Sequence, residues 1–354
     1  MPSLRNDAAE NTNFSRGLSK KHQLRRYNRN VSKRILVTGG AGYIGSHTAR
    51  LLSRRGYEVT VVDDLSRGYR HNVETPDFHQ LRTQQTAEMA RVLAGHDAVI
   101  HFAAFIAVGE SMQVPELYFE NNVSGSLSLA SAMLQAGVKH LVFSSTAAVY
   151  GNPQTSPILE SAPIAPVNPY GESKVMVETL LRWFDAIHGL RTIALRYFNA
   201  SGADPEGGLG EEHDPETHLI PLMLRAVSTG RPMTIFGDDY DTPDGSCIRD
   251  YIHVNDLAEA HILALEALLA GGPSDQFNAG SGSGHSVFEM IRGVEQVTGQ
   301  KVPYQIGPRR EGDPPALVAN ADKLRRVLGW SPRYVQIRDI IQSAWEFERR
   351  RARA

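Results

Sequence analysis

Three features that would point to a secreted, membrane-spanning or polyanion-binding protein are scarce in this chain. It has one cysteine, Cys247, among 354 residues, which excludes an internal disulfide framework, and no motif around it indicates a thiol nucleophile. No apolar run approaches the length of a membrane span, and no early apolar stretch is typical of a secretory signal. The formal net charge of -2 does not favour nucleic acid. We therefore expect a cytoplasmic protein that binds neither nucleic acid nor a membrane.

The first 33 residues differ in composition from the rest of the chain. They carry eight basic side chains against only Asp7 and Glu10, among many Asn and Ser and few apolar residues. A basic segment without an apolar face is expected to be a disordered, solvated tail rather than a targeting segment or an electrostatic contact. The folded protein is expected to begin near Arg34.

From Arg34 onward, short apolar runs alternate with helical stretches, a pattern typical of a parallel sheet covered by helices on both faces. The predicted strands are 35–38, 58–62, 98–102, 140–145 and 191–197, and the clearest predicted helices are 44–55 and 171–188. We therefore predict an α/β fold, a Rossmann-like doubly wound parallel sheet with a smaller C-terminal α/β substrate-binding domain.

The length of the chain allows two domains. We expect a dinucleotide-binding domain at 34–198 and mainly a substrate-binding domain at 199–347, with some segments of the second returning to the first. The boundary follows a change after Asn199, where long loops rich in Gly, Pro and Asp begin, at 204–210 and 237–245. Loops of this kind commonly carry binding residues.

Three glycines follow the first predicted strand at a spacing that suits a dinucleotide. Gly39 allows a tight turn, Gly42 lets the backbone approach a pyrophosphate, and Gly45 permits close packing of helix against strand. The N-terminus of the following helix then attracts the phosphates. Asp63 ends the next predicted strand, 24 residues after Gly39, where a carboxylate binds ribose hydroxyls and repels a 2′-phosphate. The pattern favours NAD over NADP, and over a mere glycine-rich turn beside a solvated aspartate.

Tyr170 and Lys174, within Y-G-E-S-K, indicate proton transfer. Residues four apart on a helix share one face, so Lys174 lies one turn from the Tyr170 phenol and can stabilise its anion. We therefore expect Tyr170 to act as a base near neutral pH. Beside a nicotinamide, such a base removes a hydroxyl proton as hydride leaves the same carbon, which converts an alcohol to a ketone. Without the glycine motif, a Tyr and a Lys at this spacing would be interpreted as ordinary surface residues.

A longer series of motifs resembles one family. In order along the chain they are V-T-G-G-A-G-Y-I-G-S-H, H-F-A-A, F-S-S-T-A-A-V-Y-G, N-P-Y-G-E-S-K, L-R-Y-F-N, F-G-D-D-Y-D-T-P-D-G, I-R-D-Y-I-H-V and R-R-E-G-D-P-P. From about Arg34 to near Trp345 the chain resembles the extended short-chain dehydrogenase/reductase family and, within it, the UDP-glucose (UDP-galactose) 4-epimerases. The resemblance implies an isomerase of nucleotide-sugar and galactose metabolism that holds NAD and inverts C4 of a UDP-sugar through a transient 4-keto sugar.

The same resemblance implies roles for individual residues. Tyr170 would exchange the proton of sugar O4, Lys174 would hold the nicotinamide ribose and lower the Tyr170 pKa, and Thr146 would hydrogen-bond the O4 region. The residues implied to line the cofactor are Gly39, Gly42, Tyr43, Ile44, Gly45, Asp63, Asp64, Phe102, Ala103, Ala104, Asn122, Tyr170, Lys174 and Phe198. Those implied to line the substrate are Thr146, Asn199, His218, Leu219, Thr234, Phe236, Arg249, Arg310, Asp313 and Leu317.

Charge supports part of the substrate assignment. Arg249 and Arg310 can form charge-assisted, often bidentate bonds to a diphosphate, which lysines would make less specifically. The family resemblance assigns the diphosphate to these two arginines and the uridine ribose to Asp313. The alternative is that both arginines form solvated surface pairs.

Five positions bear on the reaction and on the sugar. Ala147 and Ala148 stand where related dehydrating or decarboxylating enzymes carry an acidic residue, which favours simple epimerisation. Ile106 replaces a Lys that contacts the cofactor in many members, and a branch acting on UDP-pentoses also has an uncharged residue there. Leu317 sits where residue size is associated with admitting N-acetylated sugars, and leucine is intermediate. Arg82 falls where relatives meet the adenine, and it either stacks on that base or points to solvent.

Several functions stay open at this point. The leading hypothesis is a UDP-glucose/UDP-galactose 4-epimerase, and the alternatives are a UDP-pentose (xylose/arabinose) or UDP-N-acetylhexosamine 4-epimerase. An NAD-linked nucleotide-sugar reductase and a non-catalytic dinucleotide sensor are less favoured. By resemblance alone we expect a homodimer in which the helix after Pro115 and the helix after Tyr170 pack against those of a second copy.

His213 and His218, with acidic neighbours at 211, 212, 214 and 216, raise the question of a metal site. Their spacing fits no strong ligand motif, so we predict no metal and assign the group to structure or substrate contact. His101 and His253 lie in apolar strand-like runs and are predicted to be hydrogen-bonded core histidines.

Overall fold

The computed structural model describes residues 32–310 and 314–352. The basic tail predicted at 1–33 therefore lies almost wholly outside the described residues, and Asp313 lies outside them too. Lys33 begins a single compact unit that contains everything described below. Along this part of the chain, none of the helices combines the length and the apolar character that crossing a bilayer requires.

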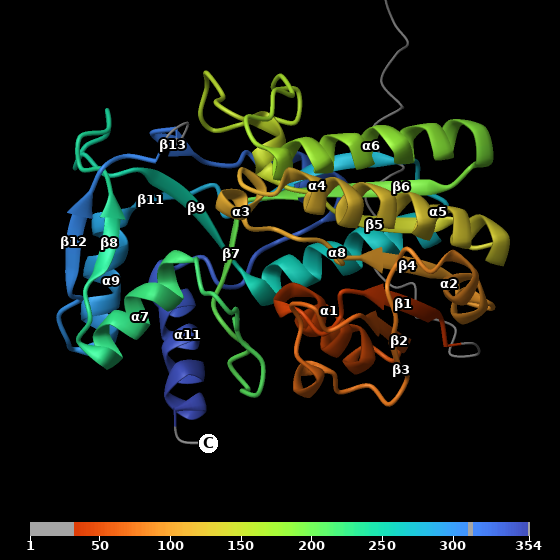
Figure 1. Cartoon of the computed structure of the whole chain (residues 1–354), viewed down its shortest axis with the longest axis horizontal. Coiled ribbons are helices and arrows are strands. Elements are labelled where there is room, and N and C mark those ends of the chain that lie inside the picture. Colours follow the sequence, from red (N-terminus) through yellow and green to blue (C-terminus); the bar gives the residue numbers. More distant parts are fainter. Residues whose placement is uncertain (1–31, 311–313, 353–354) are drawn as a thin grey trace, which may run out of the picture. The chain divides into compact units, whose positions relative to one another are not determined.

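The largest sheet of the described residues has seven strands in the order β10-β6-β5-β4-β1-β2-β3, all parallel to their neighbours (Figure 1). The strands are β1 (Arg34–Thr38), β2 (Glu58–Asp63), β3 (Phe78–Gln80), β4 (Ala98–His101), β5 (His140–Ser144), β6 (Arg191–Tyr197) and β10 (Asp275–Ala279). This order confirms the predicted Rossmann-like doubly wound sheet. The five predicted strands and two predicted helices agree with the observed bounds to within two residues.

Helices cover both faces of this sheet, as Figure 1 shows. They are α1 (Tyr43–Arg54), α2 (Thr86–Leu93), α5 (Gly125–Ala136), α6 (Pro169–His188), α8 (Val254–Leu269) and α10 (Asp322–Leu328). Alternate side chains of a strand point to opposite faces, so Ile35 and Val37 pack with α1 and α8 in one apolar core. Leu36 packs with α2 and α5 in the other. Sheets buried on both faces need such continuous apolar strands.

Two smaller sheets follow β6 in the chain. Their strands are β7 (Asn199–Ser201), β9 (Ile248–His253), β11 (Gly284–Ser286) and β13 (Ala316–Leu317) in one, with β8 (Met233–Phe236) and β12 (Tyr304–Gly307) in the other. The helices beside them are α7 (Leu219–Thr229), α9 (Val287–Thr298) and α11 (Ile337–Arg351), which share a third apolar core. β10 also follows β6 in the chain but returns to the edge of the large sheet.

The remaining helical elements of the described residues are short. They are η1 (Arg70–Asn72), α3 (Val108–Ser111), α4 (Pro115–Tyr118), the π-helical η2 (Phe119–Ser124) and the 3-10 turn η3 (Ala147–Tyr150). The α6 helix begins at Pro169 because the Asn168 side chain accepts the Gly171 amide at 2.8 Å, and it ends at Gly189, whose φ of 66° is left-handed. Tyr170 is thereby fixed in the first turn.

The strand order reverses between β1 and β4, and open α/β sheets bind ligands in the crevice at such a switch point. Gly39 and Gly42 lie in the loop after β1, Gly45 lies in the first turn of α1, and the loop after β4 contains Phe102. The fold therefore brings the predicted cofactor loop to the place where doubly wound sheets bind nucleotides.

Candidate active site

Two glycines of the motif have no room for a side chain. Gly39 has a φ of +69°, and a Cβ there would lie 2.5 Å from the amide N of Ala103, in the loop after β4. A Cβ at Gly45 would lie 2.1 Å from the carbonyl O of Gly39. Gly42 caps α1 without a side-chain bond, so the first-turn amides have no side chain competing for them. This glycine cradle fits the pyrophosphate of a dinucleotide.

Asp63 is anchored beside this cradle at the end of β2. Its carboxylate accepts the amide of Ala41 at 3.0 Å and that of Leu65 at 2.8 Å. Burial raises the pKa of Asp63, and these two hydrogen bonds oppose the rise. Next to it, Asp64 lies 3.8 Å from the half-exposed guanidinium of Arg82.

Asn122 shapes the opposite wall of the crevice. Its Oδ1 accepts the Phe105 amide at 2.8 Å, and its Nδ2 donates to the Phe105 carbonyl and to Ser173 Oγ, both at 3.0 Å. The buried amide thus ties the segment after β4, which includes Phe102 and the exposed Ile106, to helix α6. The amide of Asn122 is therefore engaged by the protein itself.

Tyr170, Lys174 and Thr146 meet in a buried position between β5 and α6. Lys174 Nζ donates to the carbonyl of Ser144 at 2.8 Å and lies 5.9 Å from the centroid of the Tyr170 ring. Thr146 Oγ1 accepts the Ala148 amide at 3.1 Å, which begins η3 and fixes the threonine beside the phenol. The structure therefore brings the three predicted catalytic residues together.

The electrostatics of this group differ from the expectation based on helical spacing. Burial raises the pKa of Tyr170 to about 12, against a smaller lowering by the Thr146 hydroxyl. Burial also lowers the pKa of Lys174 to about 7, although the nearby Glu178 favours its charged form. These two shifts oppose the expected lowering of the Tyr170 pKa by Lys174. Loss of water disfavours the charged form of both groups, and the lysine cannot supply a full charge.

A buried ion pair that sequence reasoning missed fixes α6 against the sheet. Glu178 accepts the Ser145 hydroxyl at 2.5 Å and the Arg196 Nε at 3.0 Å. Arg196 Nη1 also donates to the Tyr150 hydroxyl at 3.0 Å. These bonds join β5, β6 and η3 to the helix that carries Lys174. One signal was available, since Glu178 stands one turn after Lys174 on the same helical face.

Three predicted substrate residues lie on neighbouring strands around β9. Leu317 on β13 pairs in register with Arg249 on β9, and Asn199 on β7 donates its amide to the Asp250 carbonyl at 2.9 Å. Leu317 and Phe198 both pack against the apolar side chains of η3, the turn that follows Thr146. The small sheet is thus in contact with the catalytic segment.

Other predicted substrate residues form a second group on β8. The Arg310 guanidinium lies over the Phe236 ring, 4.1 Å from its centroid. Thr234, two residues earlier, accepts the Gln305 amide at 3.2 Å across the two-stranded sheet. Leu219 begins α7. Arg310 is therefore placed beside β8.

Histidines at three positions have clear structural partners. His101 bonds Thr38 Oγ1 at 2.6 Å and Ser126 Oγ at 2.9 Å. His253 accepts the Asn255 amide at 3.0 Å, so the prediction of hydrogen-bonded core histidines is confirmed for both. His218, predicted to line the substrate, instead turns its Nδ1 to Glu211 Oε1 at 2.7 Å.

Residues 35–280 match the model of the NAD dependent epimerase/dehydratase family. The chain is 49% identical over 318 residues to the UDP-glucose 4-epimerase of Halalkalibacterium halodurans, which covers 89% of this chain and 95% of that protein. A crystal structure of UDP-glucose 4-epimerase from Brucella ovis in complex with NAD has a TM-score of 0.87 at 45% identity, over 89% of this chain and 98% of that one. The UDP-glucose-4-epimerase from Stenotrophomonas maltophila, solved with bound NAD and formylated UDP-arabinopyranose, has a TM-score of 0.88 at 42% identity. The match covers 91% of this chain and 99% of that one.

Proposed function

Because the chain belongs to the NAD-dependent epimerase/dehydratase family, we propose that it interconverts UDP-glucose and UDP-galactose by epimerisation at C4. The observation that carries this proposal is the buried meeting of Tyr170, Lys174 and Thr146 in a fold whose first strand leads into a glycine cradle suited to a dinucleotide. The 49% identity to a UDP-glucose 4-epimerase supports the same reaction. The enzyme is an isomerase, since oxidation and reduction at one carbon cancel.

The glycine cradle and Asp63 would hold NAD. The first-turn amides of α1 would face the pyrophosphate, and the anchored carboxylate of Asp63 would accept the ribose hydroxyls and repel a 2′-phosphate. When bound, NAD supplies an acceptor for the hydride of C4 and returns it to the other face of the ketone. The crevice must therefore retain its cofactor through a full cycle.

Tyr170 moves the proton of the reaction. It takes the proton from sugar O4 as C4 is oxidised and gives it back as C4 is reduced, while Thr146 orients the same oxygen. The phenol needs a lower pKa than burial leaves it in the ligand-free protein. A positive charge lowers the pKa of a nearby phenol, so we expect the cationic nicotinamide ring and a protonated Lys174 to provide this change together.

Arg249 and Arg310 would bind the diphosphate of the substrate from two sides. Arg249 projects from β9 and Arg310 stacks on Phe236 of β8, so the two small sheets together could hold one nucleotide. Ala147 and Ala148 bring no acid to C5 or C6, which supports epimerisation over dehydration. A UDP-pentose is the second candidate, because the uncharged Ile106 is exposed in the wall after β4.

The test is product analysis with purified protein and no added NAD. Separate incubations with UDP-galactose, UDP-N-acetylgalactosamine and UDP-arabinose should give the C4 epimers, fastest from UDP-galactose. Tyr170→Phe should lower turnover by about 100-fold or more, as expected for loss of a general acid–base group, while NAD stays bound. Tyr304→Phe, at an exposed tyrosine, serves as the control. Full activity of Tyr170→Phe, or net consumption of NAD, would contradict the proposal.

We further propose that α5 and α6 form a homodimer interface. The two helices pack side by side (Figure 1), and they expose Leu127, Met176, Trp183 and Ile187, the last two at 58% and 68%. Large apolar side chains gathered on one face commonly mark an interaction site. Sedimentation analysis should give a dimer for the wild type and a monomer for Trp183→Glu with Ile187→Glu, and a wild-type monomer would refute the interface.

A further inference from the structure

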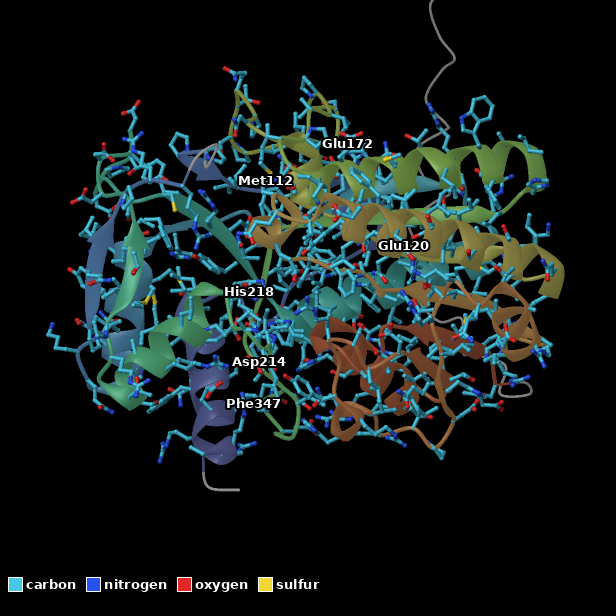
Figure 2. The ribbon with its side chains drawn as sticks, in the orientation of Figure 1. Met112, Glu120, Glu172, Asp214, His218 and Phe347 are labelled. Carbon is cyan, nitrogen blue, oxygen red and sulfur yellow. The ribbon has the colours of Figure 1, made fainter. Side chains whose placement is uncertain are left out.

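The loop between β7 and α7 gathers four side chains that the proposed chemistry does not use. Glu211, His213, Glu216 and His218 each offer one ligand atom, and these atoms all lie within 4.8 Å of one another. Figure 2 labels His218 and Asp214 in this loop, between α7 and α1. The spacing E-x-H-x-x-E-x-H matches no strong ligand motif, and only the folded loop brings the four groups together.

The two carboxylates are buried, and their closest charged neighbours are the two histidines. The side chains of Glu211 and Glu216 are 6% and 0% exposed. Glu211 Oε1, Glu216 Oε2 and the Nδ1 atoms of both histidines have no well-aligned hydrogen bond to any described residue, although His218 Nδ1 lies 2.7 Å from Glu211 Oε1. Arg225 reaches only to 3.9 Å from Glu216 Oε2. Burying two carboxylates in this way is costly unless a cation balances their charge.

The distances between ligand atoms suit a small tetrahedral ion. Bonds of about 2.0–2.1 Å in a tetrahedron place neighbouring ligand atoms about 3.3 Å apart. The Nδ1 of His213 lies 3.5 Å from Glu211 Oε1 and 3.8 Å from Glu216 Oε1. The Nδ1 of His218 lies 3.4 Å from Glu216 Oε1 and 2.7 Å from Glu211 Oε1. Three of the four separations are therefore within half an ångström of the tetrahedral value.

We propose that Glu211, His213, Glu216 and His218 form a structural site for a divalent transition metal, with Zn²⁺ as the best match. Two imidazoles and two carboxylates suit Zn²⁺, whereas Ca²⁺ and Mg²⁺ need six or more oxygens. Two carboxylates also neutralise the charge of the ion. With four protein ligands the site is closed, which is the arrangement of structural rather than catalytic zinc.

Contacts around the cluster indicate what the metal stabilises. The His213 ring packs edge-on to Tyr43 with 6.3 Å between ring centroids, and the Tyr43 hydroxyl donates to the Gly202 carbonyl at 2.6 Å. Tyr43 is the first residue of α1, directly after the glycine cradle. Glu216 Oε1 accepts two backbone amides, at 2.8 and 2.9 Å, which orients it as an outer shell orients a ligand. The metal thus fastens the loop before α7 to the start of the cofactor helix.

The test is metal analysis of the full chain purified without a histidine tag. Plasma mass spectrometry should find about one zinc per chain in the wild type, and less than about a tenth in Glu211→Gln and His213→Gln. Glu212→Gln is the matched control, because this adjacent glutamate bonds His71 outside the cluster and should keep its metal. Chelation should lower the unfolding temperature of the wild type but not of Glu211→Gln.

Two results would overturn the proposal. One is a wild-type protein that holds no zinc after incubation with Zn²⁺ and gel filtration, which would leave an ion-paired cluster only. The other is equal zinc in Glu211→Gln and wild type, which would place the metal elsewhere. Should the variants fail to fold, Co²⁺ loaded into the chelated wild type decides the matter. Intense visible bands of tetrahedral Co²⁺ support the site, and the weak bands of octahedral Co²⁺ refute it.

Discussion

Replacing Lys174 with methionine is expected to stabilise the ligand-free protein and abolish its turnover. Burial lowers the pKa of this amine from its ordinary value of 10.5 to about 7. Each unit of pKa corresponds to about 1.4 kcal/mol, so burying the amine costs about 4 kcal/mol at pH 7, where the unfolded chain is fully protonated. The hydrogen bond to Ser144 returns about 1 kcal/mol. Removing both should raise the free energy of unfolding by roughly 2–4 kcal/mol.

The pH dependence of this gain in stability shows whether the buried charge of Lys174 causes it. The folded pKa lies below the unfolded one, so between pH 7 and pH 10.5 the unfolded chain holds more protons on Lys174 than the folded chain does. Stability rises with pH wherever the unfolded state binds more protons. The cost is therefore complete below pH 7 and disappears above pH 10.5. The burial cost falls to about 2 kcal/mol at pH 9, so after the hydrogen-bond offset the advantage of Lys174→Met over the wild type should shrink to about a third.

The assay is urea unfolding of cofactor-free protein, followed by tryptophan fluorescence at pH 7 and pH 9. Lys301→Met is the matched control, because Lys301 is 90% exposed and its removal should leave stability unchanged at both pH values. A Lys174→Met protein no more stable than the wild type at pH 7 would refute the reasoning. So would an advantage of the same size at both pH values.

Three further predictions follow from the described contacts. Gly45→Ala places a Cβ 2.1 Å from a carbonyl oxygen and should abolish NAD binding in calorimetry, whereas Gly109→Ala, with open space around it, should bind NAD normally. Asp63→Asn should weaken NAD binding by about 10- to 100-fold and reduce the preference for NAD over NADP. An unchanged preference for NAD in the same titrations would contradict the assignment of Asp63 to the ribose. Arg196→Met leaves Glu178 buried without its partner and should lower the free energy of unfolding by about 3–5 kcal/mol in urea; a loss below 1 kcal/mol would show that the pair is not needed.

Features that depend on local order in the chain could be predicted from the sequence. Short apolar runs and helical spacing predicted five of the seven strands of the large sheet and two of its covering helices to within two residues. The glycine spacing predicted the cradle, because Gly45 and Gly39 are near neighbours in sequence and their contact is local. Tyr170 and Lys174 could be placed on one helical face for the same reason.

Features that depend on what surrounds a residue could not be predicted in this way. The opposing pKa shifts of Tyr170 and Lys174 arise from burial by β5 and α6, which no spacing reveals. The ion pair of Glu178 and Arg196 joins a helix to a strand 18 residues away.

The cluster around Glu211 illustrates the division between sequence and fold. Its four residues lie close together in the sequence, yet their ligand atoms meet only because the loop is packed between α1 and α11. A Cβ at Gly210 would meet the Phe347 ring of α11 at 2.3 Å, and His213 packs on Tyr43 of α1. The sequence by itself determined which elements form and which residues share a face, since these follow from local periodicity. Only the tertiary structure decided which groups lose water and which charges meet, because both depend on segments brought together by packing.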